Sequence, residues 1–248
     1  MNKKATEFKI PQPQNCQVWL DFDGTVTRQD VLDELIKKFS VNDSWKIIEE
    51  KWQKGLIGSR QCLQEQFDLL RISPVQLEQT LDGIELDEGI FTLLELLESN
   101  RVPVMVLSDS TDVFIRHILQ RNGITKLMFR SNSVVHRDIR LELRCSNGKA
   151  SCEFAAAHCK CGTIEIMGDP NRRNIYIGDG RSDLCPARKA DYVFAKSILA
   201  QCLEKEAIPF NRYSNLSDVA AVLSECWQRP GTKSKLCGSV TGKGRKHQ

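Results

Sequence analysis

Two carboxylates follow a short apolar run near the start of the chain. The run 18–20 is of the kind that makes a buried strand, and Asp21 and Asp23 come directly after it. Because residues i and i+2 of a strand point to the same face, both carboxylates should project from the carboxyl end of this strand, where ligands bind in open α/β sheets. Two like charges so close together are costly to bury unless a proton or a metal ion intervenes. The pattern alone fits an acidic turn after an edge strand or an active site.

Three more polar stretches occur where other predicted elements end or begin. Ser108 closes the apolar run 102–107, and Lys160 opens a helix-like segment. The stretch Gly-Asp-Gly-Arg-Ser-Asp at 178–183 follows the strand-like run 174–177. We therefore expect these side chains, like the two aspartates, to lie at the ends of secondary-structure elements.

Together these stretches resemble a known family. Asp-Phe-Asp-Gly-Thr-Val-Thr at 21–27 resembles the first motif of the haloacid dehalogenase superfamily, most of whose members are magnesium-dependent phosphatases. The other stretches match the later motifs in the same order, and the resemblance covers roughly residues 16 to 225. It implies a magnesium-dependent phosphomonoesterase that acts on a small phosphorylated metabolite. The fold expected is α/β, a three-layer doubly wound parallel sheet (Rossmannoid) with an inserted helical cap.

The resemblance also implies a role for each acidic residue. Asp21 would be the nucleophile that forms an aspartyl-phosphate, and Asp23 would protonate the leaving group and then activate water. Mg²⁺ would be held by Asp21, the backbone carbonyl of Asp23 and the side chain of Asp179, while Asp183 would orient the metal's water ligands. A non-catalytic binding protein on this fold is the alternative from another class, but it would have lost the nucleophile or the metal ligands.

The phosphate group has its own expected partners. By the same resemblance Thr25 would shape the turn beside the phosphate, Ser108 would hydrogen-bond a phosphoryl oxygen, and Lys160 would neutralise developing charge. Lys149 is the fallback for the lysine, because the cysteine-rich loop blurs the alignment there.

The candidates for substrate specificity are Asp30, Gln66, Asp109 and Arg181. In phosphoserine phosphatases a cap arginine and a glutamate grip the substrate; these fall on Gln66 and Asp30 here, so phosphoserine is disfavoured. Closer resemblances are the 2-hydroxy-3-keto-5-methylthiopentenyl-1-phosphate phosphatases of methionine salvage, which Asp30 fits, and the phosphoethanolamine/phosphocholine phosphatases, which Ser108-Asp109 fits. Asp109 either caps a helix that begins near residue 111 or receives a positively charged group of the substrate.

A cluster of thiols precedes and surrounds the lysine. The candidates for a structural zinc site are Cys145, Cys152, His158, Cys159 and Cys161. No Cys-x-x-Cys spacing occurs, so we favour free thiols in a loop. Ten cysteines in a chain without a visible secretory signal favour reduced thiols and a cytoplasmic location.

Bulk composition is that of an ordinary globular protein, with 41% hydrophobic and 27% charged residues among 248. Residues 229–248 hold six basic residues and no acid, so the formal charge of +3 leaves −3 on the rest of the chain. We therefore expect a disordered basic tail rather than a nucleic-acid or membrane partner. The sequence does not fix the oligomeric state.

The elements that must position these residues follow from periodicity. Amphipathic stripes predict helices throughout roughly 28–99, with Ser73 as the N-cap of one of them, and alternation in 131–144 predicts a hairpin. The helical stretch is too long for a simple connection, so we expect an inserted cap. The expected divisions are an N-terminal extension 1–15, a core of 16–27 and 86–228, a cap 28–85 and the tail 229–248.

Overall fold

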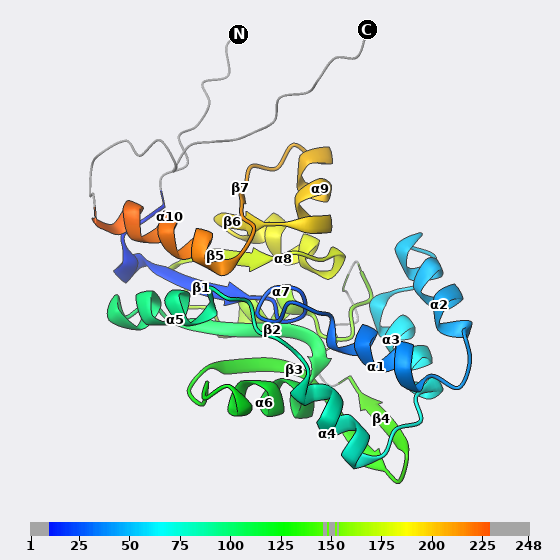
Figure 1. The fold of residues 1–248 in the computed structure, drawn as a ribbon. Helices are drawn as coiled ribbons and strands as arrows, with labels where there is room; N and C mark the ends of the chain where they lie inside the picture. Colours follow the sequence, from blue (N-terminus) through cyan, green and yellow to red (C-terminus); the bar gives the residue numbers. More distant parts are fainter. Residues whose placement is uncertain (1–9, 146–147, 149–151, 153, 229–248) are drawn as a thin grey trace, which may run out of the picture. The chain divides into compact units, whose positions relative to one another are not determined.

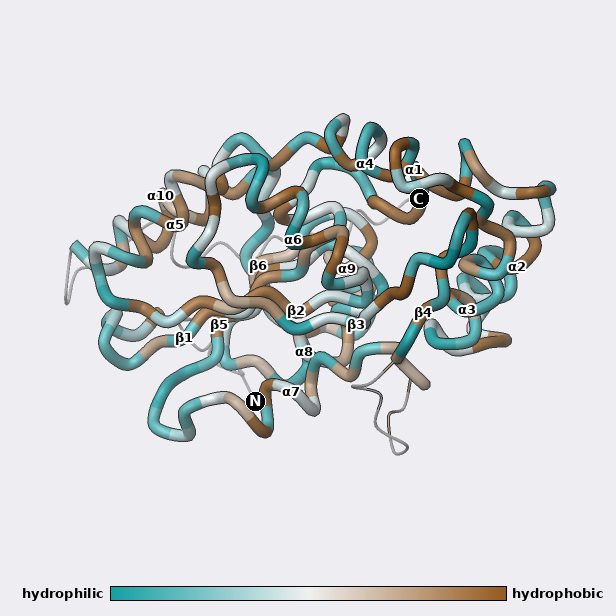
Figure 2. Tube along the Cα trace, turned by 90° about the horizontal axis from the view of Figure 1, so that it is seen from below, coloured by the Kyte–Doolittle hydropathy of each residue, from teal (hydrophilic) through white to brown (hydrophobic). Residues whose placement is uncertain are grey.

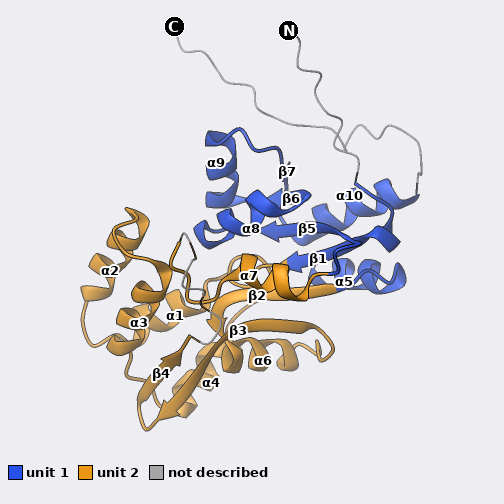
Figure 3. Cartoon of the chain, turned by 180° about the vertical axis from the view of Figure 1, so that it is seen from behind, with its two compact units in different colours: residues 1–19, 88–103, 169–248 blue, residues 20–87, 104–168 orange. Residues whose placement is uncertain are grey.

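The computed structural model describes residues 10–145, 148, 152 and 154–228 (Figure 1). The predicted basic tail and Lys149 lie outside these residues. The chain forms two compact units (Figure 3). The first unit comprises 1–19, 88–103 and 169–248, and the second comprises 20–87 and 104–168. These two units do not test the expected division into a core and a cap, which stays a prediction.

The first unit carries β1 (Cys16–Leu20), β5 (Arg173–Gly178), β6 (Tyr192–Ala195) and β7 (Asn211–Arg212), in this spatial order. The pairs β5–β6 and β6–β7 are parallel, with Ile175 opposite Tyr192. All five residues of β1 and the last four of β5 are buried, as expected for parallel strands covered on both faces. The helical segments are η1 (Pro13–Asn15), α5 (Ile90–Ser99), η2 (Arg181–Asp183), α8 (Leu184–Lys189), α9 (Ser197–Lys205) and α10 (Leu216–Gln228), with α5 packed on α10.

The second unit carries β2 (Val104–Thr111), β3 (Met128–Arg137) and β4 (Arg140–Arg144). Strands β2 and β3 are parallel, and β3 and β4 form the predicted antiparallel hairpin, with Val134 opposite Leu143. The helices α6 (Asp112–Arg121) and α7 (Lys160–Met167) both contact β2, and Figure 2 shows them on opposite sides of it. The unit therefore has the layered β–α arrangement of a doubly wound fold.

Four helices fill the segment between the first aspartate motif and residue 83. They are α1 (Val31–Phe39), α2 (Ser44–Gln53), α3 (Ser59–Leu69) and α4 (Pro74–Asp82). The predicted N-cap Ser73 is confirmed: it forms a capping box with Gln76, and Pro74 opens the helix. The helical character expected from periodicity is thus present, and it arises from local signals that the sequence carries.

The described cysteines are largely as expected. Eight are free thiols: Cys16, Cys62, Cys145, Cys152, Cys159, Cys161, Cys185 and Cys202. Cys226 is disulfide-bonded, so the expectation of reduced thiols is wrong for that residue; Cys237 lies outside the described residues. Within the described part of the chain, no helix combines the length and apolar character needed to span a membrane.

Candidate active site

The turn after β1 is built to present Asp21 and Asp23. The backbone N–H groups of residues 25–27 all donate to the carbonyl oxygen of Phe22, at 2.8 to 3.2 Å, which winds the chain tightly. Gly24 supplies the positive φ of 74° that this turn requires. The two aspartates therefore sit at the entrance of a fixed turn directly behind a buried strand.

Asp21 is paired with a buried lysine. Lys160, the first residue of α7, donates from Nζ to Asp21 Oδ1, and the two residues are only 3% and 5% exposed. A buried charge is tolerated when it is paired, so each side chain stabilises the charged form of the other. The structure thus brings the predicted nucleophile and the predicted phosphate-binding lysine together from positions 139 residues apart.

Asp23 lies against Ser108, which stands within β2 and not at its end as the sequence suggested. Its Oδ1 accepts from the Val31 N–H at 3.0 Å, and its Oδ2 accepts from Ser108 Oγ at 3.2 Å. Burial raises the pKa of Asp23 to about 6, although these two hydrogen bonds and the charge of Lys160 favour the ionised form. A carboxyl group with this pKa can give and take a proton near neutral pH. Thr25 lies fully buried in the same turn.

In the first unit, Asp183 holds the loop that carries Asp179. Asp183 is fully buried, and its Oδ2 accepts from the N–H groups of Asp179 at 3.0 Å and Gly180 at 2.9 Å. Its Oδ1 accepts from Tyr176 Oη at 2.6 Å. A Cβ atom on Gly178 would lie 2.5 Å from Asp183 Oδ2, so only glycine permits this close approach. Asp183 therefore fixes the loop, while Asp179 remains partly exposed.

The predicted specificity residues lie on different elements and make different local contacts. Asp30 is the exposed N-cap of α1, and its side chain accepts from the Asp33 N–H. Gln66 is buried on α3 and donates to Glu49 Oε2 at 3.2 Å. Arg181 opens η2 with a half-buried side chain. Their suggested part in substrate selection stays a prediction.

Asp109 does not act as a helix cap. The N-cap of α6 is Thr111, and no side chain caps that end. The Asp109 carboxylate instead accepts from Ser59 Oγ at 3.0 Å and from the His158 N–H at 2.7 Å. The capping expectation was wrong because tertiary partners 50 and 49 residues away take the carboxylate oxygens that a local cap would use.

Among the described residues, no group of side chains close enough to hold a metal ion includes a residue of the cysteine loop. The structure therefore gives no support to a zinc site in this loop. The sulfur atoms of Cys159 and Cys161 are 3.9 Å apart, and burial raises the pKa of Cys159 to about 11, which keeps the thiol protonated. His158 Nε2 and Thr163 Oγ1 form a hydrogen bond of 3.1 Å. Free thiols are therefore the better description, and the zinc interpretation lacks support.

Sequence reasoning missed two residues that organise the site. Ser59 meets Asp109 from a distant helix, and no local pattern signals that contact. Tyr176 anchors Asp183, and here a signal existed: a tyrosine within a buried apolar strand needs a hydrogen-bond partner for its hydroxyl.

Comparison with known proteins shows which family the chain is similar to. The model of the family described as Putative Phosphatase matches residues 16–203. The 2-hydroxy-3-keto-5-methylthiopentenyl-1-phosphate phosphatase of Bacillus mycoides (strain KBAB4) is 26% identical over 216 residues, covering 84% of this chain and 96% of that protein. The corresponding protein of Bacillus thuringiensis subsp. konkukian (strain 97-27) is also 26% identical, over 219 residues, with the same shares covered.

Solved structures share the fold. A HAD-family hydrolase from Salmonella enterica subsp. enterica serovar Typhi matches with a TM-score of 0.69 at 18% identity, over 87% of this chain and 73% of that one. A substrate-bound phosphoserine phosphatase matches with a TM-score of 0.60 at 23% identity, over 75% and 90%. The family match extends over most of the chain and includes the Asp21 turn, Ser108, Lys160 and the Asp179 loop. The chain belongs to the Putative Phosphatase family, and it shares its fold with solved phosphoserine phosphatases.

Proposed function

We propose that this phosphatase hydrolyses a small phosphomonoester with Asp21 as nucleophile and Asp23 as general acid and base. The observation that carries the proposal is the buried Asp21–Lys160 pair together with Asp23, whose pKa is raised to about 6 by burial. The pairing keeps Asp21 ionised and therefore nucleophilic, whereas Asp23 can hold a proton near neutral pH. Two neighbouring carboxyl groups thus have different protonation states, as nucleophilic attack with acid assistance requires.

The proposed reaction has two steps. An Asp21 carboxylate oxygen attacks phosphorus, the bond from phosphorus to the substrate oxygen breaks, and Asp23 gives its proton to the departing alkoxide. The Asp23 carboxylate then takes a proton from water while the water oxygen attacks phosphorus. This attack releases inorganic phosphate and restores the Asp21 carboxylate. Ser108 and Lys160 would hydrogen-bond the phosphoryl oxygens, with Thr25 supporting the turn beside them.

Magnesium fits the donor set. Carboxylate oxygen is the ligand type that Mg²⁺ prefers, and the family resemblance supports aspartate ligands at positions 21 and 179. We propose Asp21 and Asp179 as ligands, with the backbone carbonyl of Asp23. Asp183 uses both carboxylate oxygens to hold the Asp179 loop, which supports an indirect role for it. When bound, Mg²⁺ would offset the negative charge of the phosphate.

For the substrate we propose the enol phosphate of methionine salvage, 2-hydroxy-3-keto-5-methylthiopentenyl-1-phosphate, which the two Bacillus relatives are named for. A second candidate is an amino-alcohol phosphate such as phosphoethanolamine or phosphocholine. It is favoured by the negative charge around Cys62 on α3: burial raises the pKa of Cys62 to about 12, and four carboxylates from α2, α3, β2 and the N-cap of α1 add to the shift. These carboxylates are Glu49, Glu65, Asp109 and Asp30. The expected cytoplasmic location stays a prediction.

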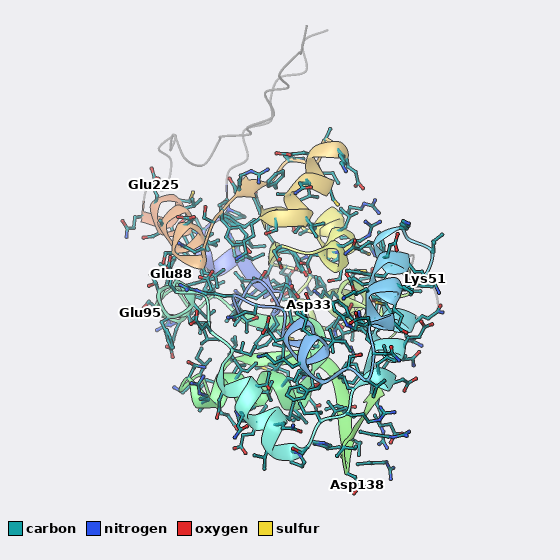
Figure 4. All side chains as sticks on the ribbon, turned by 45° about the vertical axis from the view of Figure 1, so that its right-hand side comes forward. Asp33, Lys51, Glu88, Glu95, Asp138 and Glu225 are labelled. Carbon is teal, nitrogen blue, oxygen red and sulfur yellow. The ribbon has the colours of Figure 1, made fainter. Side chains whose placement is uncertain are left out.

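A phosphate-release assay with Mg²⁺ tests both levels of the proposal. The panel contains the enol phosphate, phosphoethanolamine, phosphocholine, phosphoserine and an aryl phosphate. We expect the enol phosphate to have the highest kcat/KM, whereas the highest value for a cationic substrate would favour the second candidate. Asp21→Asn should abolish turnover of all of them. The control is Asp33→Asn on the exposed face of α1 (Figure 4), which should retain activity. Activity in folded Asp21→Asn would contradict the assigned nucleophile.

A further inference from the structure

Asp109 connects three segments that are far apart in the sequence. Its Oδ2 accepts from Ser59 Oγ at 3.0 Å, and its Oδ1 accepts from the His158 N–H at 2.7 Å. Ser59 is 7% exposed, and its Oγ also accepts from the Ala157 N–H at 3.2 Å. The backbone carbonyl of Asp109 accepts from Asn132 Nδ2 at 2.6 Å, which holds the end of β2 against β3. Both carboxylate oxygens of Asp109 therefore accept hydrogen bonds from other parts of the protein.

The start of α3 and the loop 155–158 meet along several consecutive residues. The Arg60 N–H donates to the Ala155 carbonyl oxygen at 3.1 Å. A Cβ atom on Gly58 would lie 2.5 Å from Ala155 Cβ, so this contact depends on glycine. Together with the bonds of Ser59, these contacts join residues 58–60 of the helical segment to the loop.

This loop leads directly into Lys160. Lys160 follows His158 by two positions, opens α7 and pairs with Asp21 through its buried Nζ. Where the loop is held therefore determines where the lysine enters the site. A shift of the His158 backbone by a fraction of an ångström would be passed on to Nζ, since buried packing leaves little room for compensation.

We propose that Asp109 is a positioning residue that couples the start of α3 to the loop carrying Lys160, and so sets the lysine against Asp21. The proposal rests on the proposed function, because it assigns Lys160 a part in the reaction. The alternative, that Asp109 receives a cationic group of the substrate, stays a prediction that the same test decides. In the described contacts, both oxygens of its carboxylate already accept hydrogen bonds from the protein.

The test compares Ser59→Ala, Asp109→Asn and the double variant, with Ser44→Ala as matched control. Ser44 is also the first residue of a helix, α2, but it is exposed. For each purified full-length protein, kcat and KM are measured with Mg²⁺ for phosphoethanolamine and for an aryl phosphate whose leaving group carries no positive charge. Urea unfolding establishes that each variant is folded.

We expect kcat to fall by about tenfold or more in each single variant, equally for both substrates, because a charge-assisted hydrogen bond of roughly 1.4 kcal/mol or more is lost from the arrangement that orients Lys160. KM should change less. The double variant should be no worse than the more damaged single one, since both changes break the same unit. A loss confined to phosphoethanolamine, expressed mainly in KM, would instead make Asp109 a substrate ligand and overturn the proposal.

Amide hydrogen exchange separates this inference from the proposed function. The N–H groups of Ala157 and His158 should exchange slowly in the wild-type protein. The Ala157 amide should exchange faster in Ser59→Ala, and both should do so in Asp109→Asn, with no change in Ser44→Ala. This readout does not need turnover, so an inactive wild-type protein would contradict the proposed function while the exchange data still decide the coupling. Unchanged exchange at both amides in both variants would overturn it.

Discussion

Replacing Asp23 by Asn should make the metal-free protein more stable at neutral and alkaline pH. The ionised Asp23 is unfavourable in the folded state because burial raises its pKa from 3.8 to about 6. Asn removes the charge but keeps the shape. Its amide oxygen can accept from the Val31 N–H and its NH₂ group can donate to Ser108 Oγ, so both contacts of Asp23 have a replacement.

The sign and size follow from proton binding. Between pH 3.8 and about 6 the folded protein holds a proton that the unfolded chain has lost, so the free energy of unfolding falls as the pH rises through this window. Each pKa unit corresponds to about 1.36 kcal/mol, which gives a loss of about 3 kcal/mol that is complete above the folded-state pKa. Asp23→Asn lacks this loss. The variant should gain up to about 3 kcal/mol at pH 8 and little at pH 3.5.

The assay is urea unfolding in the presence of a chelator at pH 3.5, 5 and 8. The control is Asp138→Asn, at the exposed tip of the β3–β4 hairpin (Figure 4), where φ is +52° and Asn is equally acceptable. The control should change stability by less than about 0.5 kcal/mol at each pH. An Asp23→Asn protein that is less stable than the wild type at pH 8, or a gain that does not depend on pH, would refute the reasoning.

Further predictions concern the metal, the Asp179 loop and His158. A chelator should stop turnover and added Mg²⁺ should restore it. Full activity in excess chelator would contradict the metal assignment. Asp179→Ala should remove this metal response with little loss of stability. Asp183→Asn should lower the free energy of unfolding by about 2 kcal/mol or more, because it disrupts a buried acceptor of three hydrogen bonds. Burial and the nearby positive charges lower the pKa of His158 from 6.5 to about 4, so the contribution of His158 to the free energy of unfolding should fall as the pH drops from about 6.5 to about 4, opposite in sign to the contribution of Asp23. In urea unfolding, the free energy of unfolding of the wild type relative to His158→Gln should fall as the pH drops through this window, and a difference that does not change with pH would exclude His158 as a source.

Much of the fold could be predicted because its signals are local. The buried strand before Asp21, the capping box at Ser73 and the hairpin around residue 138 each depend on neighbours within a few positions. The alternation of strands and helices, together with the family resemblance, was enough for the α/β class. Figure 2 shows the same periodicity in the structure, with hydrophobic residues recurring along α6 and α10 between hydrophilic ones.

The errors arose where tertiary contacts outweigh local rules. Asp109 stands close to a helix start, and a local rule makes such a carboxylate a cap, but Ser59 and the loop before Lys160 hold it instead. No periodicity or spacing connects residues 59 and 109. The free thiols that we favoured for the cysteine loop agree with the structure, in which Cys159 and Cys161 are buried free thiols and burial raises the pKa of Cys159.

The most direct test of the central claim is to trap the phosphorylated enzyme and locate the phosphate. The wild-type protein is mixed with substrate and Mg²⁺, quenched in acid within one turnover, and reduced with borohydride, which converts an aspartyl-phosphate to homoserine. Peptide mass spectrometry should then show homoserine at position 21, and none in samples without substrate or in Asp21→Asn. Homoserine at position 23 or at any other aspartate, or active enzyme that yields none at position 21, would contradict the assignment of Asp21 as the nucleophile.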